Sequence, residues 1–231
     1  MKQLALLFDL DGTLTDSGEG VINCVQLALR HFGIPCEDRT ALRAFVGPPL
    51  RESFPRFGVP EDQVETAVEI YRSRYNPIGI YENEVYPGVR EMLAALRDRG
   101  YAMYVATSKP ESMAMTVLRR FALDGYFNLV CGANLEGTRD SKADVLRYLL
   151  KSLPEGMRPL MIGDTIYDVE GAAALDIPAV GVSWGYGSIG EMEAAGAVAV
   201  IDSPDALLPL LEQDDFLNKI LTGSHFYRNL H

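Results

Sequence analysis

Two aspartates stand two positions apart directly after the apolar run Leu4–Phe8: Asp9 and Asp11, which Gly12 and Thr13 follow. Residues i and i+2 of a strand point the same way, so both carboxylates face together at the carboxyl end of this strand. In open α/β sheets, ligands bind at that edge. Two like charges held side by side are costly unless something compensates them. The pair therefore predicts a ligand site whose negative charge another part of the fold must balance.

The strands and helices predicted around this pair indicate a parallel sheet covered by helices on both faces. After Tyr86, short apolar runs alternate with segments of helical periodicity, which is typical of an α/β fold. One such helix carries apolar residues from Val89 to Leu96 and ends at Gly100. The predicted strands are 4–9, 101–107, 127–133, 159–163, 178–184 and 197–202. We therefore expect a Rossmann-like, doubly wound parallel sheet formed by residues 1–16 and 85–231.

Residues 17–84 follow a different pattern, with helical segments and no convincing strand. A long helix is expected between Pro60 and Gly79, with the buried stripe Val64, Ala67, Val68, Tyr71 and Tyr75. This segment separates the first strand from the rest of the sheet. It predicts an all-helical cap, inserted into the core as a lid.

Composition excludes several classes of partner. The chain has 231 residues and a formal net charge of −11, which argues against nucleic acid or an anionic membrane surface. No apolar stretch approaches the roughly 18 residues of a membrane helix, and the first apolar run is too short for a signal peptide. The three cysteines and three histidines indicate neither a disulfide framework nor a zinc site. We expect a soluble, cytoplasmic protein.

Four motifs, in this order, resemble the signatures of the haloacid dehalogenase superfamily, whose members are mostly phosphatases. The first is "DLDGT" at 9–13, and the second is the strand end "YVATS" with Thr107. "SKADVL" places Lys142 at the start of a helix, and "MIGDTIYD" supplies Asp164 and Asp168. The resemblance spans nearly the whole core and implies a phosphatase fold with a small helical cap.

The resemblance implies a covalent mechanism. Asp9 would attack phosphorus and form an aspartyl-phosphate, and Asp11 would act as general acid and then as general base. Thr107 and Lys142 would hold the phosphoryl oxygens as charge develops.

The resemblance also implies a Mg²⁺ cofactor, which prefers oxygen ligands. Asp9 and Asp164 would bind it through carboxylates and Asp11 through its backbone carbonyl, while Asp168 would lie outside this set, close to Lys142. A metal ion and the ammonium group of Lys142 would together balance the negative charge of the paired aspartates.

Several assignments have alternatives. Ser108 could replace Thr107 as the phosphate-binding hydroxyl, and Thr107 could instead cap the helix that begins near Glu111. Lys109 is the alternative cation, because Ala143 follows Lys142 where many relatives have proline. Asp168 could belong only to the first turn of a helix, where acids are favourable.

The stretch "GYGSIG" at 185–190 mimics a dinucleotide-binding fingerprint. The helix expected after it, about 190–195, is too short for a normal dinucleotide-binding unit. We therefore expect a loop at the rim of the phosphatase site, with Ser188 as a helix N-cap.

The stretch from Tyr86 to Pro110 resembles the phosphoglycolate phosphatase-like subgroup, so phosphoglycolate or a similar small phosphomonoester is the favoured substrate. The alternatives are a 5'-nucleotidase acting on nucleoside monophosphates and a sugar-phosphate mutase. A dehalogenase would lack an acid at Asp11, and a phosphonatase needs a cap lysine that residues 17–84 do not contain.

Substrate selection is expected in the cap, because the core handles only the phosphate. An arginine that faces the site would suit a carboxylate or a second phosphate. The candidates are Arg43 and Arg51, followed by Arg72 and Arg74. A receiver-like module phosphorylated on Asp9 is disfavoured by the large insertion, and a non-catalytic scaffold by the complete motifs.

Overall fold

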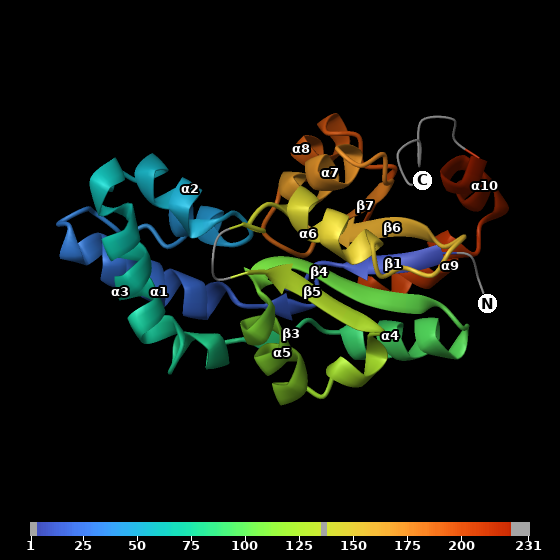
Figure 1. Cartoon of the computed structure of the whole chain (residues 1–231), viewed down its shortest axis with the longest axis horizontal. Helices are drawn as coiled ribbons and strands as arrows, with labels where there is room; N and C mark the ends of the chain where they lie inside the picture. The colour runs from blue at the N-terminus through green and yellow to red at the C-terminus, as the bar shows by residue number, and fades with distance from the viewer. Residues whose placement is uncertain (1–3, 135–137, 223–231) are drawn as a thin grey trace.

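A computed structural model describes residues 4–134 and 138–222 of the chain. Its core is a six-stranded parallel sheet with the strand order β5-β4-β1-β6-β7-β8 (Figure 1). The strands in chain order are β1 Leu4–Phe8, β4 Ala102–Pro110, β5 Leu129–Ala133, β6 Arg158–Gly163, β7 Ala179–Val182 and β8 Ala199–Ile201. This order is that of a doubly wound sheet. Strands β4 and β5 lie on one side of β1 and strands β6 to β8 on the other, so the strand order reverses between β1 and β6. The predicted fold class is confirmed.

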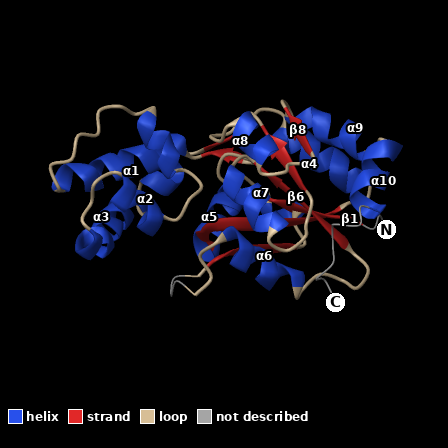
Figure 2. Ribbon diagram, turned by 90° about the horizontal axis from the view of Figure 1, so that it is seen from above, coloured by secondary structure: helices blue, strands red, loops and turns tan. Residues whose placement is uncertain are grey.

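Helices cover both faces of the sheet, and alternate residues of β1 enter the two resulting cores. Leu4, Leu6 and Phe8 pack in one core with the helices on one face, whereas Ala5 and Leu7 pack in the other. The first face carries α4 Val89–Asp98, α5 Glu111–Arg120, α9 Leu207–Leu211 and α10 Asp214–Thr222. The second carries α6 Lys142–Leu150, α7 Ile166–Ala173 and α8 Ile189–Ala194 (Figure 2).

The segment between β1 and α4 forms a group of helices beside the carboxyl ends of the strands (Figure 1). It contains α1 Gly18–His31, α2 Leu50–Arg56 and α3 Val64–Tyr75, and short 3₁₀ turns at Ala41–Phe45, Glu61–Gln63 and Gly79–Tyr81. The stripe expected on the long helix is buried on α3, where it packs on α1. We call residues 17–84 the cap, the division proposed from the sequence.

A two-stranded antiparallel ribbon joins the cap to the core. β2 Thr15–Asp16 pairs with β3 Glu84–Val85, so the chain leaves the core and returns to it at the same place. The ribbon was not predicted from the sequence, because two-residue strands show no periodicity.

In the part of the chain that the structure describes, no helix combines the length and the hydrophobicity needed to cross a membrane. The histidines at 225 and 231, and the C-terminal residues after Thr222, lie outside the described residues.

Candidate active site

The residues predicted to carry the chemistry lie together where β1, β4 and β6 end, beside the point where the strand order of the sheet reverses. Asp9 and Asp11 follow β1, and Asp164 follows β6. Thr107 lies near the end of β4, and Lys142 is the first residue of α6. Parallel strands bring their carboxyl ends to one edge, so residues far apart in the sequence become neighbours here.

Asp9 is buried beneath the cap, with 4% of its surface exposed. Burial raises the pKa of Asp9 to about 6, because a charge is poorly solvated there, and Lys142 opposes part of this rise. A buried carboxylate with little hydration is a suitable nucleophile once a cation compensates its charge.

Lys142 supplies that compensation. Its Nζ lies 2.9 Å from Asp9 Oδ1 and 2.8 Å from Asp168 Oδ1, and it donates a hydrogen bond to the Ala106 carbonyl at 2.8 Å. Burial alone would lower the pKa of Lys142, but Asp168 and Asp9 raise it overall, so the lysine is an ammonium. With its side chain 4% exposed, Lys142 is no solvated surface lysine.

Asp168 does two jobs with its two oxygens. Oδ2 accepts hydrogen bonds from the backbone N–H and hydroxyl of Thr165, both at 3.0 Å, which caps the first turn of α7. Oδ1 contacts Lys142. Both interpretations from the sequence, an acid in the first turn of a helix and a neighbour of the lysine, therefore describe the same side chain, and the structure adds its capping bonds.

Asp164 is fully buried and is held by two neutral donors. The Thr13 hydroxyl donates to its Oδ1 at 3.1 Å, and the Tyr186 backbone N–H donates to its Oδ2 at 2.9 Å. Burial and the charges of Asp168 and Asp9 raise the pKa of Asp164 well above its ordinary value. Among the described residues, no ion pair to a lysine or arginine neutralises Asp164.

The charges around Asp164 fit a divalent cation. Oxygens of Asp9, Asp164 and Asp168 all lie within 4.8 Å of one another, and Lys142 is the cation that contacts two of them. Three buried carboxylates against one lysine leave negative charge to be balanced, and an all-oxygen donor set suits Mg²⁺. The cluster includes Asp168, which the sequence analysis placed outside the ligand set.

Thr107 and Ser108 both border the cavity between the strand ends and the cap. Thr107 is buried, and its Oγ1 accepts a hydrogen bond from the Lys109 backbone N–H at 3.2 Å. The N-cap position of α5 belongs to Pro110, so Thr107 does not cap that helix.

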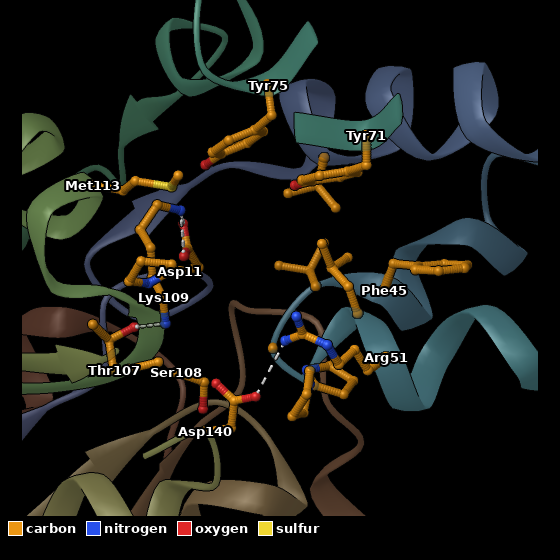
Figure 3. Close-up of a pocket in the computed structure, with 18 of the residues that line it drawn as sticks. Asp11, Phe45, Arg51, Tyr71, Tyr75, Thr107, Ser108, Lys109, Met113 and Asp140 are labelled. Atoms are coloured by element: carbon orange, nitrogen blue, oxygen red, sulfur yellow. Dashed lines mark hydrogen bonds and ion pairs between the residues drawn. The ribbon is translucent and has the colours of Figure 1, made fainter. Parts of the chain in front are cut away.

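Lys109 pairs with Asp11 and not with Asp9. Its Nζ lies 2.7 Å from Asp11 Oδ2 and 2.9 Å from Oδ1 (Figure 3). Burial alone would lower the pKa of Lys109, but the charge of Asp11 raises it overall. The two lysines that the sequence offered as alternatives thus both reach the site, one beside each aspartate of the pair.

The cavity above these residues has an apolar cap wall. It encloses about 910 Å³ of empty space, its open mouth included. Figure 3 shows Phe45, Tyr71 and Tyr75 of the cap facing Thr107, Ser108 and Lys109 of the core. Further apolar cap residues complete this wall, namely Val21, Val46, Pro48, Pro49, Leu50 and Val68.

The cap arginines fall into two groups. Arg51 and Arg72 line the cavity, and Arg51 contacts Glu65 at 2.6 Å and Asp140 of the core at 3.5 Å. Arg43 and Arg74 do not line this cavity. Arg43 lies over the Tyr186 ring at 5.0 Å, and Arg74 pairs with Glu82 at 2.8 Å.

The family model for haloacid dehalogenase-like hydrolases matches residues 6–182, which is more than half of the chain. The protein belongs to the haloacid dehalogenase-like hydrolases. The matched residues run from β1 to the end of β7 and include Asp9, Lys142 and Asp164.

Among curated relatives, the hydrolase is 44% identical over 193 residues to a 5'-nucleotidase of Pseudomonas aeruginosa, a match that covers 82% of this chain and 86% of that protein. It is 42% identical to the tyrosine-protein kinase PtkA of Mycobacterium tuberculosis, over 79% of this chain and 62% of that one. A phosphoglycolate phosphatase of Rhodospirillum rubrum is 33% identical, with 86% of each chain covered. The crystal structure of a predicted phosphatase from Clostridium acetobutylicum superposes with a TM-score of 0.86 at 40% identity, covering 91% of this chain and 99% of that one.

The glycine-rich loop of the hydrolase lies against Asp164. A Cβ on Gly185 would come within 2.4 Å of the Asp164 side chain, so only glycine lets the loop backbone approach this carboxylate. The next residue, Tyr186, then donates its N–H to Asp164. The loop therefore belongs to the site, as the sequence indicated, and Ser188 precedes α8 without a side-chain capping bond. Sequence reasoning did not connect Tyr186 with Asp164, since spacing alone does not show which carboxylate a loop approaches.

Proposed function

We propose that this hydrolase is a Mg²⁺-dependent phosphatase that cleaves a small organic phosphomonoester through an aspartyl-phosphate on Asp9. The observation that carries the proposal is the arrangement around Asp9, where a buried carboxylate is paired with Lys142 and clustered with Asp164 and Asp168. The cluster would hold the metal ion, with the Asp11 carbonyl as a further ligand. Bound Mg²⁺ would supply positive charge to the phosphoryl oxygens.

The proposed reaction has two steps. In the first, an Asp9 oxygen bonds to phosphorus, the bond to the leaving oxygen breaks, and Asp11 gives that oxygen a proton. In the second, water bonds to phosphorus, the bond to Asp9 breaks, and Asp11 takes the proton from the water. Thr107 or Ser108, together with Lys142, would hold the phosphoryl oxygens, and burial beneath the cap would keep bulk water from the first step.

The apolar cap wall favours a nucleoside monophosphate as the substrate. Phe45, Tyr71 and Tyr75 line the cavity with aromatic carbon, which suits contact with a base. Phosphoglycolate has only one methylene group to bury there. The similarity to the 5'-nucleotidase of Pseudomonas aeruginosa at 44% identity points the same way.

Phosphoglycolate, the substrate that the sequence favoured, is the second candidate here, and Arg51 is the observation in its favour. Arg51 lines the cavity with its guanidinium between Glu65 and Asp140, where a substrate carboxylate could replace one of these partners. The phosphoglycolate phosphatase of Rhodospirillum rubrum is the relative that supports this alternative.

Arg51→Ala separates the two candidates. If Arg51 binds a substrate carboxylate, kcat/KM for 2-phosphoglycolate should fall by about 30-fold or more, or ~2–4 kcal/mol, while nucleoside monophosphates change little. If the apolar wall selects the substrate, nucleoside monophosphates should have the higher kcat/KM, with small and equal losses on every substrate. The measurement is kcat/KM for 2-phosphoglycolate, nucleoside monophosphates and hexose phosphates.

Arg72→Ala repeats this comparison for the other arginine that lines the cavity, and Arg43→Ala is the matched control because Arg43 points to Tyr186. A substrate-selective loss in Arg43→Ala would contradict the assignment of the cavity as the substrate site. Release of inorganic phosphate in the same assays distinguishes a phosphatase from a sugar-phosphate mutase, which passes the phosphoryl group to a hydroxyl.

A further inference from the structure

Lys109 is a second buried lysine in the active site. Its Nζ contacts both carboxylate oxygens of Asp11, and the side chains of the two residues are 6% and 13% exposed. An ammonium has three N–H donors, and this geometry directs two of them toward the oxygens of Asp11. The contact fixes where the Asp11 carboxylate lies.

The backbone is built to aim Lys109 at Asp11. The pairing of β4 with β5 shifts register between Thr107 and Pro110, so the strand bulges at the lysine. The Lys109 carbonyl lies so close to Gly132 of β5 that a Cβ there would be 2.5 Å away. On the other side of the peptide, the Lys109 N–H donates to Thr107 Oγ1. The bulge changes the direction of the Lys109 side chain at the edge of the site.

The cap holds Lys109 from the opposite side. Its Nζ lies 5.1 Å from the centre of the Tyr75 ring on α3, a distance at which a cation is attracted to an aromatic face. Tyr75 itself is buried and stacks on Tyr71. Lys109 is therefore fixed between an aspartate of the core and an aromatic ring of the cap, as Figure 3 shows.

We propose that Lys109 is a positioning residue that fixes where the Asp11 side chain lies for its proton transfers, which with an activated aryl phosphate are needed in the second step alone. In that step water bonds to phosphorus, the bond between phosphorus and the Asp9 oxygen breaks, and the proton of the water passes to Asp11. A general base must lie within hydrogen-bond reach of the proton that it accepts, so the place of the Asp11 side chain decides how fast this transfer occurs. The inference rests on the proposed function, because it requires an aspartyl-phosphate.

The test is a rapid-quench measurement with Lys109→Met and an activated aryl phosphate, whose leaving group needs no proton. Formation of the phosphoenzyme should change by less than about threefold, while its breakdown slows by about tenfold or more, so that phosphoenzyme accumulates. Lys109→Arg keeps the positive charge and should recover part of the breakdown rate. A lysine that merely stabilised the fold would lower the melting temperature and leave the ratio of the two rates unchanged.

A double variant keeps the test usable if Lys109→Met folds poorly because Asp11 is left unpaired. Asp11→Asn should slow breakdown by itself, and adding Lys109→Met should slow it no further, because the lysine acts through Asp11. Additional slowing in the double variant, or breakdown at the wild-type rate in Lys109→Met, would overturn the inference. Failure to trap any phosphoenzyme in Asp11→Asn, in which breakdown should be slow, would overturn the proposed function as well.

Discussion

Asp9→Asn should fold normally and lose nearly all turnover, with kcat lower by at least about 10³-fold. An amide oxygen is too weak a nucleophile to attack phosphorus, so the loss comes from the chemical step. The measurement is steady-state hydrolysis of an aryl phosphate, whose good leaving group makes the first step as easy as possible. Retention of more than about a tenth of the wild-type activity, a barrier change of only ~1.4 kcal/mol, would remove Asp9 as the nucleophile.

The stability of Asp9→Asn is the control for this result. The pKa of Asp9 is raised to about 6 by burial, so the ionised carboxylate costs the fold some stability at neutral pH. A neutral amide removes that cost, and Lys142 keeps its contact with Asp168. The melting temperature should therefore stay close to that of the wild type, which separates a chemical loss from an unfolded protein.

Removal of the metal is the second change with a large expected effect. Excess chelator should abolish activity, and Mg²⁺ should restore it, because the carboxylate cluster is left with uncompensated negative charge. Ca²⁺ should inhibit, since it accepts irregular coordination and more ligands than Mg²⁺.

Asp164→Asn tests whether Asp164 is a ligand of this metal ion. The amide keeps the shape of the side chain and can still accept the Thr13 hydroxyl, but it is a much weaker metal ligand. The Mg²⁺ concentration for half-maximal activity should rise by about tenfold or more. The matched control is Asp140→Asn, an aspartate of the same cavity outside the cluster, for which the Mg²⁺ requirement should not change. Full activity in chelator would exclude a dissociable metal from the mechanism.

Much of the site could be predicted because it consists of strand ends. Asp9, Thr107 and Asp164 each follow a buried apolar run, and parallel strands bring such positions to one edge whatever lies between them. The start of α6 at Lys142 was likewise marked in the sequence, where Ser141 caps the helix by accepting the Asp144 N–H.

The pairing of side chains could not be predicted in the same way. The sequence favoured Lys142 as the cation, with Lys109 as the alternative, and it did not show that Lys109 lies beside Asp11 at a bulge in β4 while Lys142 lies beside Asp9. The cap arginines illustrate the same limit. Arg51 and Arg43 lie eight positions apart with similar neighbours, yet one lines the cavity and the other stacks on Tyr186.

The choice of substrate depends on packing between the cap and the core. The sequence showed Tyr71 and Tyr75 as residues of a buried helical stripe, which they are, but their rings also form part of the cavity wall. Periodicity reports that a face is covered and does not show whether a protein core or a ligand covers it. The substrate can therefore be inferred only from the cavity that the cap and the core form together, and the comparison of kcat/KM values tests that inference.

The most direct measurement is to quench the wild-type enzyme during turnover of an aryl phosphate and locate the phosphoryl group by mass spectrometry of its peptides. The reaction through Asp9 predicts one phosphoryl group on the peptide that contains Asp9 and Asp11. It should be absent from Asp9→Asn, and reduction of the acyl phosphate with borohydride should convert Asp9 to homoserine. A phosphoryl group on any other residue, or turnover with rapid phosphate release and no label on Asp9, would contradict the account.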